Sequence, residues 1–128
     1  MTRLTLSKQE RLSSRKDIET LFERGQSLAK YPVRLVWMKC QDMGDYPVSV
    51  MFSVSKKKFS KAVDRNRIKR LLRENYRLLK PSLYQALPGD TTILLGILFT
   101  GTDLPSFDDI QKGLNMALER LITLIRKE

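Results

Sequence analysis

The spacing of apolar residues predicts a first helix near the start of the chain. Between Ser14 and Arg24 apolar residues recur at intervals of three and four, as on one face of a helix. Ser14 followed three residues later by Asp17 is typical of a capped helix start, and Gly25 is a favourable C-terminal stop. We therefore expect one helix over residues 14–24.

Three runs of branched and apolar residues predict strands, at residues 33–39, 48–54 and 91–99. The first two would run antiparallel if the loop between them, residues 40–47, closes a hairpin. The third run is apolar nearly throughout, which is typical of a central strand that is buried on both faces. The pattern leaves open whether a further short strand lies within residues 27–31.

Two more helices are predicted from helical periodicity and from residues that typically begin or end a helix. Residues 61–80 have a helical pattern that we expect Pro81 to end, and Ser106 with Asp109 marks another capped start. The resulting order, α-β-β-α-β-α, predicts a single α+β domain over residues 1–128, with a small sheet against helices. By the general rule, a strand–helix–strand crossover within it would be right-handed. The stripe of the last helix comprises Ile110, Leu114, Ala117, Leu118, Leu121 and Ile125.

The helix expected at residues 61–80 has two distinct faces. On a helical wheel its apolar residues form a stripe about 120° wide that would pack on the sheet. The adjoining face is cationic, and Glu74 is the only acid on the polar side after the first turn. The stripe comprises Ile68, Leu71, Leu72, Leu78 and Leu79, and the cationic face Arg65, Lys69, Arg70, Arg73, Arg77 and Lys80.

The distribution of charge along the chain indicates a binding surface in addition to a fold. The 128 residues include 24 Lys and Arg against 14 Asp and Glu, a formal charge of +10. Residues 55–80 hold 11 basic and 2 acidic residues, so this stretch alone is +9. A charge concentrated in this way indicates a polyanionic partner rather than a need for solubility. Arginine outnumbers lysine in the helix, which favours structured nucleic acid, because guanidinium groups bind phosphates in pairs of hydrogen bonds and stack on bases.

The composition also excludes several classes of protein. The absence of histidine rules out a Ser-His-Asp triad, a Cys-His dyad and a His-ligated metal site. Cys40 is the single cysteine, so it forms no intrachain disulfide and is expected to be an incidental thiol. No apolar run is long enough for a membrane span, and the first residues are too polar for a secretory signal. We expect a cytoplasmic protein with no membrane partner, no small-molecule substrate and no metal site, since Asp42, Asp45, Asp108 and Asp109 lie at turns and helix starts.

One stretch closely resembles a known family. Residues 52–77 read FSVSKKKFSKAVDRNRIKRLLRENYR, and this combination of Ser-Val-Ser-Lys-Lys with Ala-Val-x-Arg-Asn-Arg-x-Lys-Arg-x-x-Arg resembles the protein subunit of bacterial ribonuclease P. The match covers about a fifth of the chain and is highly specific. Arg11-Leu12 and the 17–25 segment match more loosely, and the last 48 residues match only in the order of elements.

The resemblance implies a fold and a function beyond the patterns themselves. It implies the order α-β-β-β-α-β-α, so that the open strand is real, and a left-handed crossover, contrary to the general rule. It implies a noncatalytic subunit of an endoribonuclease, whose RNA subunit removes the 5′ leader of precursor tRNA. The partners would be ribonuclease P RNA and precursor tRNA, and the Mg²⁺ ions would belong to the RNA, with no cofactor bound by the protein.

The resemblance also assigns residues to two surfaces. The first would contact the catalytic RNA and comprises Arg65, Asn66, Arg67, Lys69, Arg70 and Arg73, together with Ser55, Lys56 and Lys57. The second is a cleft for the leader and comprises Phe22 and Ile18, with Arg34 and Val36 added by position only.

Four points qualify the leader cleft. Ile18 stands where the family usually has an aromatic residue, which weakens base stacking there. The loop at 58–61 is one residue longer than is common in the family. Phe22 at helical spacing is also compatible with a core position. Trp37 is expected to pack on a sheet face, with the cleft as the alternative.

Two other classes of protein remain as alternatives. A ribosomal or other structural RNA-binding protein would bind one RNA and would lack a leader cleft. A DNA-binding regulator would place the helix at 65–80 in a groove, but a strand and a Lys-rich loop precede this helix, rather than the first helix of a helix-turn-helix motif.

Overall fold

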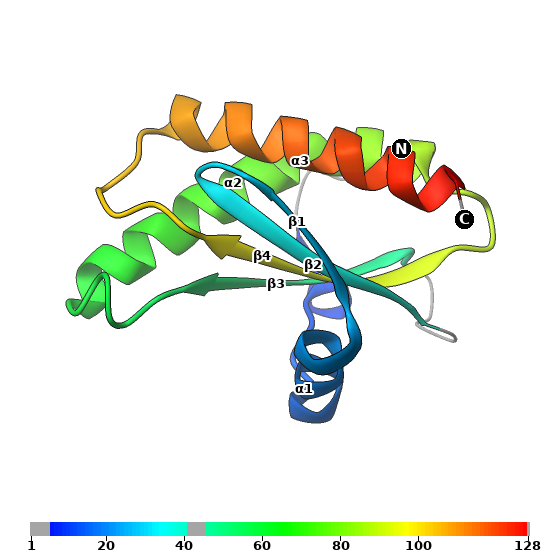
Figure 1. The fold of residues 1–128 in the computed structure, drawn as a ribbon, viewed down its shortest axis with the longest axis horizontal. Coiled ribbons are helices and arrows are strands. Elements are labelled where there is room, and N and C mark those ends of the chain that lie inside the picture. The colour runs from blue at the N-terminus through cyan, green and yellow to red at the C-terminus, as the bar shows by residue number, and fades with distance from the viewer. Residues whose placement is uncertain (1–5, 41–45, 128) are drawn as a thin grey trace.

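The computed structural model describes residues 6–40 and 46–127 (Figure 1). Asp42 and Asp45, expected to lie in a turn, fall outside the described residues. The chain order is that of the resemblance, including the short strand that the apolar pattern left open. The elements are η1 (Lys8–Glu10), α1 (Arg15–Arg24), β1 (Gln26–Lys30), β2 (Val33–Cys40), β3 (Val48–Val54), α2 (Ala62–Ala86), β4 (Thr92–Phe99) and α3 (Phe107–Lys127).

The four strands form one mixed sheet in the order β1-β2-β4-β3. β4 pairs antiparallel with β2 and parallel with β3, so β2 and β3 run in opposite directions, but β4 lies between them and they do not form the hairpin that the sequence left as one possibility. The physical reason is the composition of β4, whose residues 93–97 are all buried. In the interior of the sheet both faces of this apolar strand are buried, and β3 therefore lies at the edge of the sheet. The parallel crossover from β3 through α2 to β4 is present, and its left-handedness stays a prediction.

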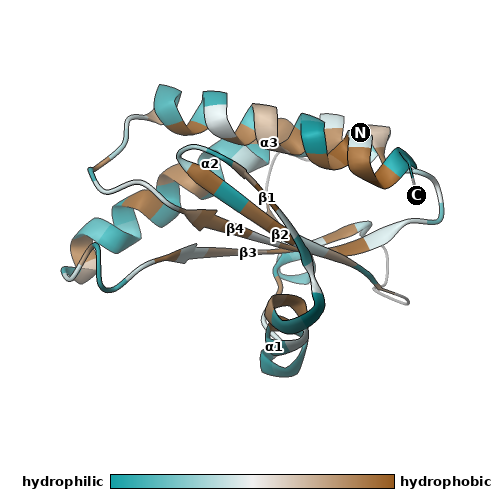
Figure 2. Ribbon diagram, in the orientation of Figure 1, coloured by the Kyte–Doolittle hydropathy of each residue, from teal (hydrophilic) through white to brown (hydrophobic). Residues whose placement is uncertain are grey.

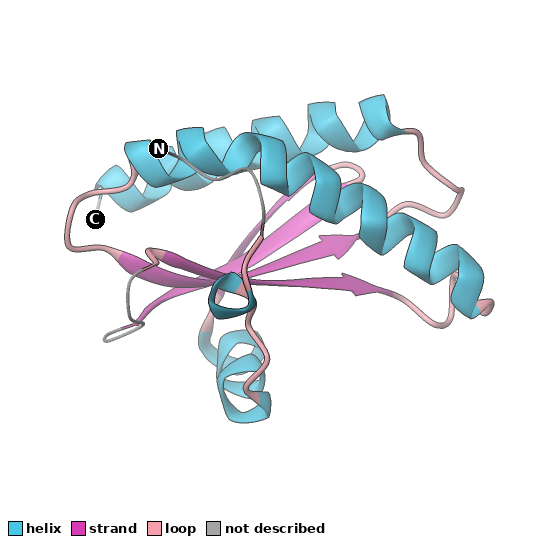
Figure 3. Ribbon diagram, turned by 180° about the vertical axis from the view of Figure 1, so that it is seen from behind, coloured by secondary structure: helices cyan, strands magenta, loops and turns pink. Residues whose placement is uncertain are grey.

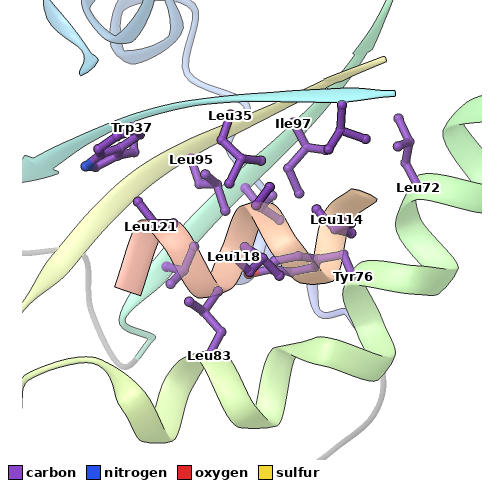
Figure 4. Packing of buried hydrophobic residues seen from close by; sticks show 14 of the residues in the cluster. Leu35, Trp37, Leu72, Tyr76, Leu83, Leu95, Ile97, Leu114, Leu118 and Leu121 are labelled. Carbon is purple, nitrogen blue, oxygen red and sulfur yellow. The ribbon is translucent and has the colours of Figure 1, made fainter. Parts of the chain in front are cut away.

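Helices cover the two faces of the sheet unequally. α2 and α3 lie on one face, whereas α1 lies on the opposite face (Figure 1). Alternation along β2 directs Leu35 and Trp37 into the larger core beneath α2 and α3, and Val36 into a smaller cluster beneath α1. In Figure 4, Leu35 and Trp37 lie on the face of the sheet toward α3. Trp37 is 2% exposed, which confirms its predicted role in packing on a sheet face.

α2 is longer than its sequence pattern predicts. We expected Pro81 to end the helix, because proline has no backbone N–H and crowds the preceding turn. The helix instead continues through Pro81 to Ala86. Tertiary contacts outweigh the local penalty here, because the next turn buries Leu83 in the main core and brings Tyr84 to Glu10.

The helix starts agree with the predictions, but the end of α1 has a different cause. Ser14 Oγ accepts a hydrogen bond from the backbone N–H of Asp17, and Ser106 and Asp109 form a reciprocal capping box. Gly25 ends α1 with a φ of −70°, so it does not adopt the left-handed conformation of a typical glycine stop. Glycine fits because a Cβ there would collide with the carbonyl oxygen of Leu21 and with Val36.

Within residues 6–40 and 46–127, no helix combines the length and the hydropathy that a membrane crossing requires.

Candidate nucleic-acid interface

The first half of α2 presents basic side chains to solvent. Asn66, Arg67 and Arg70 are exposed, and neither arginine has an acidic partner among the described residues. Figure 2 shows this part of the helix largely in the teal of hydrophilic residues. Unpaired guanidinium groups repel one another, and the phosphates of a nucleic acid would relieve that repulsion.

Arg65 lies at the same end of α2 but faces the preceding loop. Its Nη1 atom donates hydrogen bonds to the carbonyl oxygens of Phe59 and Ser60, both at 2.9 Å. This side chain therefore ties the 55–61 loop to the helix. The other guanidinium nitrogens keep donors that could also reach a phosphate.

The loop between β3 and α2 carries the other predicted RNA contacts. Ser55, Lys56 and Lys57 are all exposed where β3 ends. Beneath them Phe59 is 7% exposed and packs against Phe99, with ring centroids 5.8 Å apart. The apolar anchor therefore fixes the longer loop while its lysines remain in solvent.

The predicted cationic face does not extend over the whole of α2. Arg77 is paired with Glu74, with 2.9 Å between Nη2 and Oε2. Lys80, expected on this face, is 2% exposed and lies inside the protein, where Nζ is 2.9 Å from Glu10 Oε2. Leu78, expected in the apolar stripe, is 44% exposed, and Tyr76 is fully buried instead. The buried side of α2 rotates along the helix because α3 and the N-terminal segment cover its second half.

The Glu10–Lys80 pair belongs to a buried polar cluster. Tyr84 donates its hydroxyl to Glu10 Oε2 at 2.5 Å. Burial tends to raise the pKa of Glu10, but hydrogen bonds from Tyr84 and Lys80 outweigh it and hold this pKa below its ordinary value. Burial, with Tyr76 and Glu10 nearby, raises the pKa of Tyr84 far above its usual range. The sequence pattern missed this cluster because Glu10 is 70 residues from Lys80 and 74 residues from Tyr84.

The four residues predicted for a leader cleft lie on two elements, Ile18 and Phe22 on α1 and Arg34 and Val36 on β2, and they differ in exposure. Phe22 is 45% exposed and Arg34 is also in solvent, where Nη2 donates to Ser27 Oγ at 3.1 Å. Ile18 is half-buried at the margin of the smaller core cluster. Val36 is only 7% exposed and packs within that cluster. Phe22 and Arg34, and part of Ile18, are therefore accessible to solvent, whereas Val36 is not.

A hollow of about 330 Å³ opens between α1, β3 and α2. Its apolar lining includes Ile18, Met51 and Phe52, and its basic lining comprises Arg11, Lys69 and Arg73. The sequence pattern places Lys69 and Arg73 on one face with the other basic residues of α2, and it assigns no role to Arg11. Only the loose match of Arg11-Leu12 to the family motif pointed to this segment.

Comparisons with known proteins agree on one family. The family model for ribonuclease P matches residues 6–122. The ribonuclease P protein component of Porphyromonas gingivalis is 38% identical over 118 residues, which cover 91% of this chain and 85% of that protein. The corresponding protein of Chlorobaculum tepidum is 40% identical over 84 residues, 60% of this chain and 54% of its own length.

Solved structures give the same result for the fold. The ribonuclease P protein of Thermotoga maritima has a TM-score of 0.68 at 25% identity and covers 87% of this chain and 96% of its own. The Staphylococcus aureus protein also has a TM-score of 0.68, at 23% identity, over 88% of this chain and 94% of its own. The match to the family model, over most of the chain, decides against a ribosomal protein and a DNA-binding regulator. The chain belongs to the ribonuclease P protein family.

Proposed function

We propose that this protein is the noncatalytic subunit of ribonuclease P and that it binds both the catalytic RNA and the 5′ leader of precursor tRNA. The observation that carries the proposal is the row of exposed and unpaired cations on α2, together with the lysines of the adjoining loop. Arg65 holds the two parts together through its hydrogen bonds to Phe59 and Ser60.

The catalytic RNA would bind this outer basic surface. Arg67 and Arg70 would form paired hydrogen bonds to backbone phosphates, and Asn66 would add a polar contact. Ser55, Lys56 and Lys57 would extend the contact along the end of β3. Binding would release counterions from the RNA, and the protein charge would reduce repulsion between the catalytic RNA and its tRNA substrate.

The 5′ leader would bind on the opposite face of the sheet, beside α1. The exposed ring of Phe22 can stack on an unpaired base, and Arg34 can contact the backbone. Ile18 would add an apolar contact without aromatic stacking, and Val36 would support the surface from below. The protein would thereby position the leader relative to the cleavage site.

The chemistry of cleavage would belong to the RNA partner. This chain has no histidine and offers no acid–base pair at its basic surface. In this proposal Mg²⁺ is held by the RNA, and the protein contributes binding and orientation.

The test is reconstitution of the protein with a bacterial ribonuclease P RNA at low magnesium concentration. We expect faster cleavage of precursor tRNA at the mature 5′ end than with the RNA alone. If the protein leaves the cleavage rate unchanged, the proposed function is wrong.

A pair of charge-matched variants makes this test specific. Arg67→Gln with Arg70→Gln removes two cations from the basic face of α2. Lys112→Gln with Arg120→Gln removes two exposed cations from α3. We expect the first variant to lose most of the stimulation and the second to retain it, whereas equal losses would indicate a nonspecific charge effect.

A further inference from the structure

The loop between β3 and α2 is held from three directions. On one side the ring of Phe59 packs against Phe99, with 5.8 Å between the ring centroids. On another side Nζ of Lys58 donates to the carbonyl oxygen of Thr100 at 3.1 Å, just beyond the end of β4. Figure 3 shows this loop and the connection from β4 to α3 at the same end of the sheet. The third contact comes from Arg65 on α2.

Arg65 uses one of its nitrogens to bind the backbone of the loop. Its Nη1 atom donates to the carbonyl oxygens of Phe59 and Ser60, both at 2.9 Å. The planar guanidinium group presents its donors in a rigid fork, so it can fix two neighbouring carbonyl groups at once. Arg65 is half-buried and forms no ion pair with the residues that the structure describes. The loop carbonyls are therefore its described partners.

A turn within the loop determines which lysines remain available. The backbone N–H of Phe59 donates to the carbonyl oxygen of Ser55 at 3.0 Å, and that of Lys58 donates to Ser55 Oγ at 3.4 Å. Lys56 and Lys57 lie at the tip of this turn and are exposed. Their side chains form no ion pair or hydrogen bond with the described part of the chain.

The charge of the loop opposes its folded conformation. Residues 55–61 contain four lysines and no acidic residue, so these side chains repel one another. A loop that is free to move must lose conformational entropy when it binds a ligand, whereas a loop that is already held loses less. A contact that holds the loop would therefore raise the affinity for RNA without touching the RNA.

We infer that Arg65 is a positioning residue for RNA binding. Through the carbonyl groups of Phe59 and Ser60 it holds Lys56 and Lys57 where they would reach the phosphates of the ribonuclease P RNA. The inference rests on the proposed function. It changes the role that the family resemblance gives to Arg65, which is direct contact with the RNA.

Direct contact and positioning differ in how Arg65 and the loop lysines combine. If Arg65 only contacted a phosphate, replacing it would leave the contribution of Lys56 and Lys57 unchanged, because independent contacts add. If Arg65 positions the loop, its replacement also removes most of the contribution of these lysines. The two contributions are then coupled.

The first experiment measures the order of the loop in the protein alone, by limited digestion with trypsin and mass spectrometry. We expect Arg65→Gln to raise the rate of cleavage after Lys56 and Lys57 about tenfold, because the loop opens more often. Arg70→Gln is the matched control and should leave this rate unchanged. Arg70 is exposed on the same helix and has no described hydrogen bond to the loop. Urea denaturation of both variants separates local opening from global unfolding.

The second experiment measures the affinity of the full chain for a bacterial ribonuclease P RNA. The loop variant Lys56→Gln with Lys57→Gln is studied alone and combined with Arg65→Gln or Arg70→Gln. We expect the loop variant to weaken binding about tenfold in the wild type and in Arg70→Gln, but no more than about twofold in Arg65→Gln.

Two results would overturn the inference. One is a rate of loop cleavage that Arg65→Gln leaves unchanged. The other is a loop variant that weakens binding equally in Arg65→Gln and in Arg70→Gln. If the wild-type protein does not bind the RNA, the proposed function fails and with it the RNA role of the loop. The cleavage rates then still show whether Arg65 fixes the loop.

Discussion

The two halves of α2 carry similar cationic side chains, but tertiary contacts give these side chains opposite roles. In the first half Arg67 and Arg70 are exposed and unpaired, and they are available to a nucleic acid. In the second half Lys80 is 2% exposed and neutralised by Glu10. The difference shows that one half of a basic helix can be available for binding while the other half supports the interior. An acidic residue from a distant segment determines which of these two roles a basic side chain has.

The largest effect should follow from breaking the buried pair in the second half. Glu10→Gln leaves the Lys80 ammonium group buried without its counter-ion, which should lower the free energy of unfolding by about 3–5 kcal/mol. Urea denaturation followed by circular dichroism measures this change. The double variant Glu10→Gln with Lys80→Met should recover much of the loss, and no recovery would show that the charge pair is not the cause.

The same pair should make stability depend on pH on the acid side. The folded-state pKa of Glu10 lies below its ordinary value of 4.5, so the stabilisation that Glu10 contributes is present above about pH 4.5. It is lost as the pH falls through the lower, folded-state pKa. The difference in unfolding free energy between wild type and Glu10→Gln should therefore shrink in acid. A difference that stays constant from pH 7 to pH 3 would contradict this assignment.

The next effect concerns RNA binding by the first half. Arg67→Gln with Arg70→Gln should reduce the salt dependence of binding to the RNA subunit by about two counterions. Arg77→Gln on the same helix should have a smaller effect for one charge removed, since Arg77 is already paired with Glu74 at 2.9 Å. Filter binding over a series of salt concentrations gives both slopes. Arg77→Gln could instead change the slope by half as much as the double variant does. In that case the ion pair with Glu74 does not decide whether an arginine of α2 contributes to RNA binding.

The smallest effect is expected at Leu78, which the helical wheel placed in the core. Because its side chain is 44% exposed, Leu78→Gln should change the free energy of unfolding by no more than about 0.5 kcal/mol. Leu72, six residues earlier, is fully buried, and Leu72→Ala should lower the free energy of unfolding by about 2–5 kcal/mol. Thermal unfolding of both variants checks the contrast.

The elements that local patterns specify were predicted correctly. The capped starts at Ser14 and Ser106 depend on residues three positions apart, and the stripe of α3 repeats over many turns. β4 has the burial on both faces that its apolar run predicts. These features need no information from distant parts of the chain.

The errors come from contacts between segments that are far apart in sequence. The pairing of β3 with β4 rather than β2 depends on which strand gains most from an interior position. The continuation of α2 beyond Pro81 accompanies the burial of Leu83 and the hydrogen bond from Tyr84 to Glu10, and the buried Lys80 is paired with the same Glu10. At the candidate site, the motif predicted the basic residues of α2, but only the folded chain brings Arg11 beside Lys69 and Arg73.

The bridge between Arg11 and Val50 also covers part of a sheet edge at which another chain could pair. β3 is an edge strand, and the exposed backbone of an edge strand is a template for pairing with another chain. The N-terminal segment occupies part of this edge, where Leu12 donates to Val50. The cations of Arg11, Lys69 and Arg73 beside it repel a second positively charged copy. Positive charge at the edge of the sheet would therefore oppose pairing with a like molecule and would attract the phosphates of the proposed RNA partner.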